Sequence, residues 1–183
     1  MLKKEIVRKS VHLLTAGIIL VNIFSYELAI TLTIFTILLY IFSEFMRLKK
    51  IKIFYLTKLI ETCARPDEKN KFILAPLTLA VPILLAFLFL NPGIAYPTVI
   101  TVSISDSFAT LIGMRFGKKR IFEKKTLEGS STFFLFTFVI FYFFTNIFVT
   151  FFSAAILTLV ELFSKKIDNL TIPLFSAIIL SLV

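Results

Sequence analysis

Asp106 is the first residue whose type and position could do chemistry. It lies about two-thirds of the way along an apolar run over 94–114. A carboxyl at such a depth in a membrane costs a few kcal/mol unless it faces a polar cavity or a cation. At helical spacing Asp106 shares a face with Ala109 and Gly113, small residues that let a ligand or a helix approach closely. Asp106 is therefore either a functional carboxylate or part of a packing stripe in which it pairs with a basic residue.

A basic loop follows this segment and contains glycines and hydroxyl groups. Lys124 and Lys125 precede Gly129 and Ser130, which open the next apolar run. Backbone N–H groups at a helix N-terminus, with two lysines beside them, suit an anion such as a polyphosphate. The loop is not a Walker A motif, because G-x-x-x-x-G-K-[ST] is absent. The alternative is that the loop is basic only because it fixes the topology.

The N-terminal segment offers a third group. Arg8 and the single histidine, His12, fall on one helical face, and Lys9 is adjacent. Because a guanidinium group fits phosphate geometry, this face is a candidate site for a phosphate or a lipid headgroup. In the alternative interpretation His12 packs or hydrogen-bonds within the membrane.

Carboxylates are the fourth group, and they are expected at one membrane face. Glu161 and Asp168 bracket a Lys165–Lys166 turn, and Asp106 and Glu128 are predicted near the same face. Mg²⁺ is typically held by one or two carboxylates together with substrate phosphates. This arrangement suits Mg²⁺, although Asp168 could instead cap the last helix.

The composition indicates that a membrane must position these groups. The 183 residues are 58% apolar and 17% charged, against about 45–50% and 25% in an average soluble domain. That composition excludes a soluble globular enzyme, and the continuous apolar runs exclude an outer-membrane barrel. One cysteine and one histidine exclude a disulfide scaffold and a Cys/His metal cluster. We predict an all-α polytopic membrane helix bundle that forms a single integral-membrane catalytic domain over 1–183.

The apolar runs predict about seven transmembrane helices, with six as the alternative. The expected spans are 11–25, 26–46, 72–90, 94–114, 130–145, 146–163 and 169–183. With the N-terminus in the cytosol, every Lys and Arg falls in the inner segments 1–10, 47–71, 115–129 and 164–168. The net charge of +9 therefore reflects topology, not a nucleic-acid partner. The active site is expected on the cytosolic side.

Two segments beside the spans have simpler interpretations. Residues 47–71 form an amphipathic piece that reads as an interfacial helix on anionic lipid, with a role in substrate binding as the alternative. Its apolar residues are Ile51, Ile53, Phe54, Leu56, Leu59 and Ile60. Glu44 and Arg47 are spaced for a local ion pair. Residues 1–25 resemble a signal peptide, but no small-x-small cleavage site follows, so we expect a retained span in a prokaryotic plasma membrane.

Four motifs cover nearly the whole chain in a fixed order. They are Arg8-Lys9-x-x-His12; Asp106-Ser-x-Ala109-x-x-x-Gly113-x-x-Phe116-Gly117; Lys125-Thr126-x-Glu128-Gly129-Ser130; and Glu161 followed by Asp168-Asn169-Leu170-Thr171-Ile172-Pro173. In these motifs the chain resembles the CTP-dependent lipid-alcohol kinases, which include dolichol kinase, phytol kinase and the yeast-type diacylglycerol kinase. Ser105 departs from the pattern, since the family commonly has glycine there.

The resemblance implies transfer of the γ-phosphoryl group of CTP to a lipid alcohol in the bilayer, such as dolichol, phytol or geranylgeraniol. It implies a catalytic role for Asp106, His12 and Lys125. It implies nucleotide or phosphate contacts from Arg8, Lys9, Gly113, Gly117, Lys124, Thr126, Gly129, Ser130 and Asn169. It further implies Mg²⁺ ligands among Asp106, Glu128, Glu161 and Asp168.

Three other functions fit part of the same pattern. A CTP-dependent cytidylyltransferase would make a CDP-lipid and would share the nucleotide, the metal and the membrane face. A small membrane transporter would use Asp106 as an ion ligand, although the inverted repeats often seen in transporters are not visible. A non-enzymatic scaffold would need neither Asp106 nor Lys125. The sequence does not determine the oligomeric state.

Overall fold

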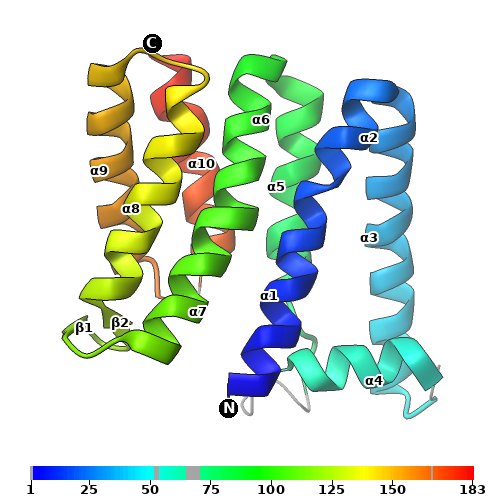
Figure 1. The fold of residues 1–183 in the computed structure, drawn as a ribbon. Coiled ribbons are helices and arrows are strands. Elements are labelled where there is room, and N and C mark those ends of the chain that lie inside the picture. Colours follow the sequence, from blue (N-terminus) through cyan, green and yellow to red (C-terminus); the bar gives the residue numbers. More distant parts are fainter. Residues whose placement is uncertain (1, 52–53, 65–70, 166) are drawn as a thin grey trace.

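The computed structural model describes residues 2–51, 54–64, 71–165 and 167–183. Helices run up and down in a bundle, and one short hairpin lies at its end (Figure 1). The helices are α1 (Leu2–Ala16), α2 (Ile18–Phe24), α3 (Tyr26–Leu48), α4 (Phe54–Cys63), α5 (Ala75–Phe89), α6 (Pro92–Ile100), η1 (Thr101–Ser105), α7 (Asp106–Phe116), α8 (Leu127–Tyr142), α9 (Ile147–Phe163) and α10 (Asp168–Ser181). The strands are β1 (Arg120–Phe122) and β2 (Lys125–Thr126). The predicted all-α class is confirmed.

Three helical stretches of the described chain are long and apolar enough to cross a membrane. They cover Lys4–Phe24, Tyr26–Leu48 and Pro92–Phe116. Helices α5, α8, α9 and α10 have 15, 16, 17 and 14 residues. At 1.5 Å per residue they are about 21–26 Å long, shorter than a hydrocarbon core of about 30 Å. These shorter helices run beside the long ones (Figure 1), and the count of seven spans stays a prediction.

The first span begins earlier than expected. The apolar run starts at Val11, but the helix already includes Lys4, because lysine and glutamate are good helix formers. An ion pair of 2.9 Å between Glu5 and Arg8, three residues apart, supports this basic turn. The basic residues before the apolar run therefore extend the helix.

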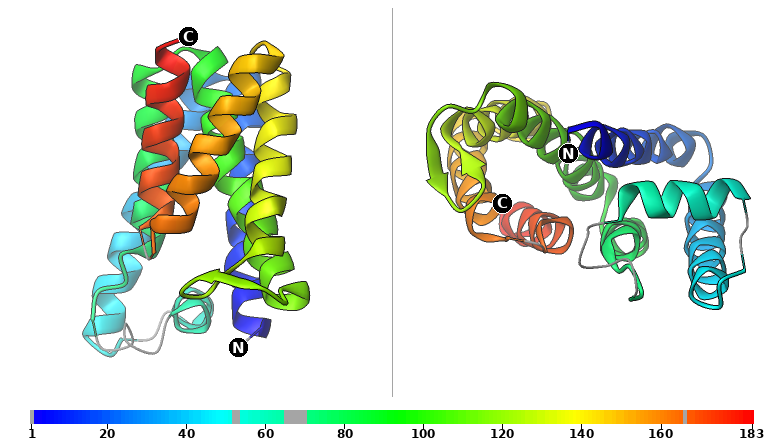
Figure 2. Two further views of the ribbon diagram at one scale, coloured as in Figure 1. Left: turned by 90° about the vertical axis from the view of Figure 1, so that its left-hand side faces the viewer. Right: turned by 90° about the horizontal axis from the view of Figure 1, so that it is seen from below.

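The basic segments gather at one end of the bundle, which we call the basic end. It carries the N-terminus, α4 and the β1–β2 hairpin, and the α9–α10 turn points toward it (Figures 1 and 2). The connections α2–α3, α5–α6 and α8–α9 lie at the opposite end, together with the C-terminus. This arrangement agrees with the predicted separation of basic and non-basic connections.

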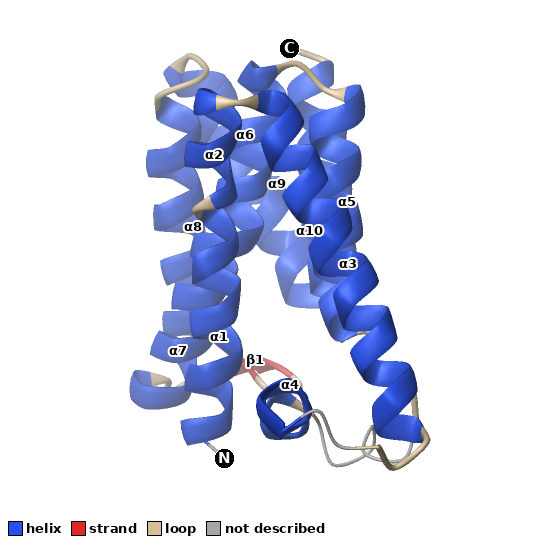
Figure 3. Cartoon of the chain, turned by 90° about the vertical axis from the view of Figure 1, so that its right-hand side faces the viewer, coloured by secondary structure: helices blue, strands red, loops and turns tan. Residues whose placement is uncertain are grey.

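Helices α1 and α3 diverge toward the basic end, and α4 crosses between them (Figure 3). The buried side of α4 is apolar where Ile60 packs with Ala64 and Ile73 against Tyr40. Lys58 on the same helix is exposed. The 47–71 segment thus contains the expected helix, whereas Ile53 and residues 65–70 lie outside the described residues.

Glu44 fixes the chain that returns from α4 to α5. Its carboxylate accepts hydrogen bonds of 2.7 Å from the Nε and Nη2 atoms of Arg47, which confirms the predicted local pair. It also accepts the backbone N–H of Ile73 at 2.7 Å, and Arg47 donates to the carbonyl of Lys71. Because Glu44 is fully buried, these bonds satisfy a carboxylate that would otherwise be costly to bury.

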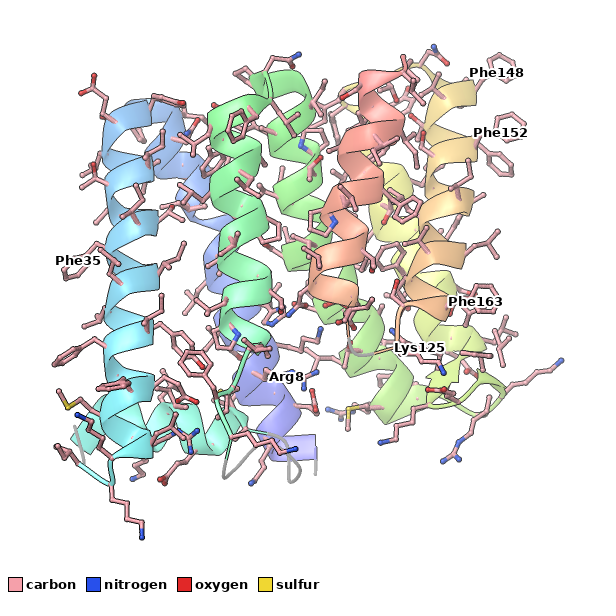
Figure 4. All side chains as sticks on the ribbon, turned by 180° about the vertical axis from the view of Figure 1, so that it is seen from behind. Arg8, Phe35, Lys125, Phe148, Phe152 and Phe163 are labelled. Carbon is pink, nitrogen blue, oxygen red and sulfur yellow. The ribbon has the colours of Figure 1, made fainter. Side chains whose placement is uncertain are left out.

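Large apolar side chains occur on both the inside and the outside of the bundle. Phe133, Phe141 and Leu157 are fully buried. Phe148 and Phe152 instead point away from the helices, as does Phe35 on α3 (Figure 4). The exposed fractions of Phe148 and Phe152 are 75% and 63%. An apolar surface of this extent requires an apolar surrounding. It supports the assignment as a membrane protein.

Candidate active site

A π-helical turn delivers Asp106 to the interior. In η1 the backbone widens, and the N–H of Asp106 donates to the carbonyl of Thr101, five residues earlier. Ser103 anchors the turn to α1, because its hydroxyl lies 2.8 Å from the hydroxyl of Thr15. Single π-helical turns occur frequently at functional sites. The turn therefore sets where the first carboxylate of the site points.

The first charged cluster joins α1 to α7. Lys9 donates its ammonium group to Oδ2 of Asp106, and the two side chains are 1% and 0% exposed. His12 lies one helical turn after Lys9, with its Nδ1 3.9 Å from the same oxygen. Oδ1 of Asp106 and Nδ1 of His12 are buried and have no hydrogen-bond partner among the described residues. Asp106 is thus paired with a basic residue but retains one carboxylate oxygen for a ligand.

The second charged cluster joins the hairpin to α9 and α10. Lys125 donates to Oε1 of Glu161, and its ammonium lies 3.9 Å from Oδ2 of Asp168. Burial lowers the pKa of Lys125, but the carboxylates of Glu161 and Asp106 raise it by more, so the net shift is upward. Lys125 therefore carries a full positive charge at neutral pH. The influence of Asp106 on Lys125 also shows that the two clusters are electrostatic neighbours.

Small residues hold the base of the hairpin against α7. A Cβ atom added to Gly129 would lie 2.9 Å from the carbonyl oxygen of Ala109, and one added to Gly113 would lie 3.0 Å from Oγ1 of Thr126. A Cβ atom added to Gly117 would lie closer still, 2.6 Å from Cγ2 of Thr126. Thr126 also caps α8 by accepting the N–H of Gly129 at 3.2 Å. The glycines therefore permit close packing, and the capped N–H is already satisfied.

Other predicted residues lie around these clusters. Arg8 pairs with Glu5 and lies at about the same depth as Lys125 (Figure 4). Lys124 is exposed, whereas Ser130 is buried, with no hydrogen-bond partner for its hydroxyl among the described residues. Asn169 donates its side chain to the carbonyl of Ala75 at 3.4 Å. The hydroxyl of Ser130 therefore remains available to a ligand, whereas Arg8 would have to exchange Glu5 for one.

The four carboxylates expected to bind Mg²⁺ do not form one group. Asp106 pairs with Lys9, whereas the pKa of Glu128 is lowered by its own backbone N–H and by that of Lys118. Glu161 and Asp168 share Lys125. Asp168 does not cap α10, whose N-cap is Ile167 without a side-chain hydrogen bond. Among the described residues no three metal-ligating side chains converge.

Glu161 and Asp168 nevertheless fit a divalent cation bound together with phosphates. Oε2 of Glu161 is buried and has no hydrogen-bond partner in the described chain. Carboxylate oxygens are hard ligands, and Mg²⁺ usually takes only one or two of them plus phosphate and water oxygens. The pair therefore supplies the number and type of protein ligands that Mg²⁺ uses with a nucleotide.

Sequence reasoning missed Thr101 and Ser103 and assigned no role to Ser105 and Ser107, the other hydroxyl residues around Asp106. Thr101, Ser103, Ser105 and Ser107 are all fully buried. Alternate residues do not share a face of a regular α-helix, so this spacing concealed their common burial. The signal was four hydroxyl side chains at every second position within an apolar run.

A comparison with known proteins finds a distant relative. An uncharacterized protein of Methanocaldococcus jannaschii is 27% identical, in an alignment that covers 97% of this chain and 93% of that protein. No family model matches the chain, and no solved structure does. The similarity extends over nearly the full length of both chains.

Proposed function

We propose that this protein is a CTP-dependent kinase that transfers the γ-phosphoryl group to a lipid alcohol in the membrane. One observation carries the proposal. Motif residues from both ends of the chain converge in two neighbouring Lys–carboxylate clusters. One is buried on helices of membrane-spanning character, and the other is partly exposed at the ends of shorter apolar helices. Buried charges are costly and are retained in membrane segments chiefly at functional sites. CTP and the alcohol class, a prenol such as dolichol, phytol or geranylgeraniol, come from the resemblance of the motifs.

The cations would hold the phosphates of the nucleotide. Lys125 is charged and partly exposed, and Arg8 lies at the same depth. The hydroxyl of Ser130, which has no partner among the described residues, could donate to a phosphate oxygen. Mg²⁺ held by Glu161 and Asp168 would neutralise phosphate charge when bound. Because phosphoryl transfer depends mainly on positioning and charge stabilisation, these groups suffice.

Asp106 would accept the proton of the lipid hydroxyl. Oδ1 is the atom for this role, because Lys9 already occupies Oδ2. As the oxygen of the alcohol bonds to the γ-phosphorus, the bond to the β-γ bridging oxygen breaks and CDP leaves. Lys9 would balance the charge of the carboxylate, and His12, beside the same oxygen, would help to hold it in place.

The alkyl chain of the substrate would remain in the bilayer. A groove of about 400 Å³ runs between α9 and α10, and its lining includes Leu159, Phe163 and Phe175. Its polar members, Ser164 and Thr171, are hydrogen-bonded to each other at 2.6 Å near Asp168. A lipid in this groove would bring its polar end toward the second cluster.

The basic end would face the cytosol of a prokaryotic cell. Basic connections favour the cytosolic side of a membrane, and the described loops at the opposite end carry no Lys or Arg. CTP is a cytosolic compound, so the nucleotide and the clusters would meet on that side.

A transfer assay tests the proposal. Detergent-purified protein is incubated with Mg²⁺, γ-labelled CTP or ATP, and geranylgeraniol, phytol, a polyprenol or diacylglycerol. We expect label in a lipid phosphate with CTP, loss of transfer in Asp106→Asn, and retention in Glu27→Gln, which removes an exposed carboxylate from the opposite end. Pyrophosphate release with a lipid phosphate would indicate the cytidylyltransferase instead. The absence of both reactions would favour a transporter or a scaffold.

A further inference from the structure

Lys125 occupies the place of a cation between two carboxylates. Its ammonium donates to Glu161 and lies 3.9 Å from Asp168, and these acidic side chains are only 3% and 12% exposed. Two carboxylates so close together repel each other unless a positive charge lies between them. The lysine supplies that charge without any ligand.

The route by which Lys125 reaches this place differs from that of a core residue. It extends from β2, outside the helices that carry the two carboxylates, and its side chain is 23% exposed. Phe122 of the same hairpin packs on Phe163 of α9, with ring centroids 5.2 Å apart. The hairpin thus lies against the end of α9, and the flexible lysine side chain spans the remaining distance. Such a side chain can change partners without a rearrangement of the helices.

A second observation indicates that the site between Glu161 and Asp168 can bind a cation with more coordination positions than an ammonium group. Oε2 of Glu161 is buried without a hydrogen-bond partner among the described residues, although the other oxygen of the same carboxylate binds Lys125. A buried carboxylate oxygen without a partner carries a large desolvation cost. A divalent cation would satisfy it, whereas the single ammonium group does not.

We propose that the ammonium group of Lys125 is a tethered cation, a positive charge that the hairpin holds between Glu161 and Asp168 and that excludes free divalent metal from this site. The ammonium group leaves the site only when a metal–nucleotide complex binds. The phosphates then provide a new partner for the ammonium, and the metal replaces it between the carboxylates. Free Mg²⁺ would have to displace Lys125 without giving it a new partner. Lys125 is thus a positioning residue that makes the metal and the nucleotide bind together. This inference rests on the proposed function only for the identity of the nucleotide.

Binding of Mn²⁺ without nucleotide tests the inference directly. Electron paramagnetic resonance counts free and bound Mn²⁺ in detergent-purified protein, with no need for CTP or lipid. We expect weak binding in the wild type and binding at least about tenfold tighter in Lys125→Met, because a unit charge about 4 Å from the site is removed. Lys125→Arg keeps the charge and should remain weak. Lys165→Met is the matched control, since its exposed lysine pairs with Glu123 instead.

The double variant Lys125→Met/Glu161→Gln locates the new binding. Its Mn²⁺ affinity should return to the weak value of the wild type, because Glu161 provides the buried oxygen without a partner. The inference is overturned if Lys125→Met binds Mn²⁺ no more tightly than Lys165→Met, or if the double variant keeps the gain. Tight binding in Lys125→Met together with no phosphoryl transfer by the wild type would support the tethered cation and reject the kinase. Phosphoryl transfer by the wild type, without tighter Mn²⁺ binding in Lys125→Met, would support the kinase and reject the tethered cation.

Discussion

The two charged clusters solve the same electrostatic problem with different architecture. In the first, Lys9 and Asp106 lie on packed helices, and both side chains are excluded from solvent. In the second, Lys125 comes from a surface hairpin and remains partly exposed, while Glu161 and Asp168 lie on helices. An ion pair inside helix packing is fixed, whereas a lysine on a hairpin can exchange partners. The comparison separates a cluster that orients a carboxylate from one that responds to a ligand.

The largest effect should come from removing the buried partner in the first cluster. Lys9→Met leaves the carboxylate of Asp106 without compensation, which should reduce the free energy of unfolding by about 3–5 kcal/mol. Replacing both residues, in Lys9→Met/Asp106→Leu, should recover most of that loss but leave the protein inactive. Thermal unfolding in detergent measures the stability, and the transfer assay measures activity. If the double variant were no more stable than Lys9→Met, the unpaired carboxylate of Asp106 would not be the cause of the lost stability.

The second largest effect should come from the base of the hairpin. Gly129→Ala places a methyl group 2.9 Å from the carbonyl oxygen of Ala109, and overpacking of this kind costs about 1–3 kcal/mol. The displaced hairpin should also move Lys125 and weaken nucleotide binding. Gly93→Ala is the matched control, because its methyl group would meet only the side chain of Asn91, at 3.2 Å. If the two substitutions lowered the melting temperature equally, the close contact between Gly129 and the carbonyl of Ala109 would have no particular importance for stability.

Much of the fold followed from apolar runs and charge distribution. The helical class, the two sides of the bundle and the Glu44–Arg47 pair were all readable, because each depends on local pattern. The lengths of the shorter helices were not, because a continuous apolar run such as 72–90 does not mark where a helix begins. The structure starts α5 only at Ala75.

The candidate site was less readable than the fold. Sequence reasoning selected Lys9, Asp106 and Lys125, but it could not pair them, because residues 97 positions apart meet only through tertiary packing. The gathering of four carboxylates was expected from their shared membrane face. The structure divides them, since each is neutralised by the nearest lysine or by backbone N–H groups. The predicted membrane face therefore indicated at which end of the bundle the carboxylates lie, but not which groups they pair with.

Lys125→Met should have a smaller effect on stability, about 1–2 kcal/mol, because solvent reaches this side chain. The raised pKa of Lys125 sets its pH dependence. Its stabilising charge is fully present below the ordinary lysine pKa of 10.5 and is lost as the pH rises through the higher folded-state value. The difference in melting temperature between wild type and variant should therefore stay constant from about pH 7 to about pH 9 and shrink only above 10.5. A difference that disappears near neutral pH would contradict the upward shift.

The smallest effect should come from the exposed ion pair between the same hairpin and the α9–α10 turn. Glu123 and Lys165 are 3.0 Å apart, but their side chains are 50% and 61% exposed. Exposed pairs contribute little, because water and salt screen them, so Glu123→Gln should change the free energy of unfolding by no more than about 0.5 kcal/mol. The difference in melting temperature between the wild type and this variant should shrink further when salt is added. A loss as large as that of Lys125→Met would mean that the hairpin is held by its surface contacts, and that the partly exposed Lys125 is not what distinguishes the second cluster.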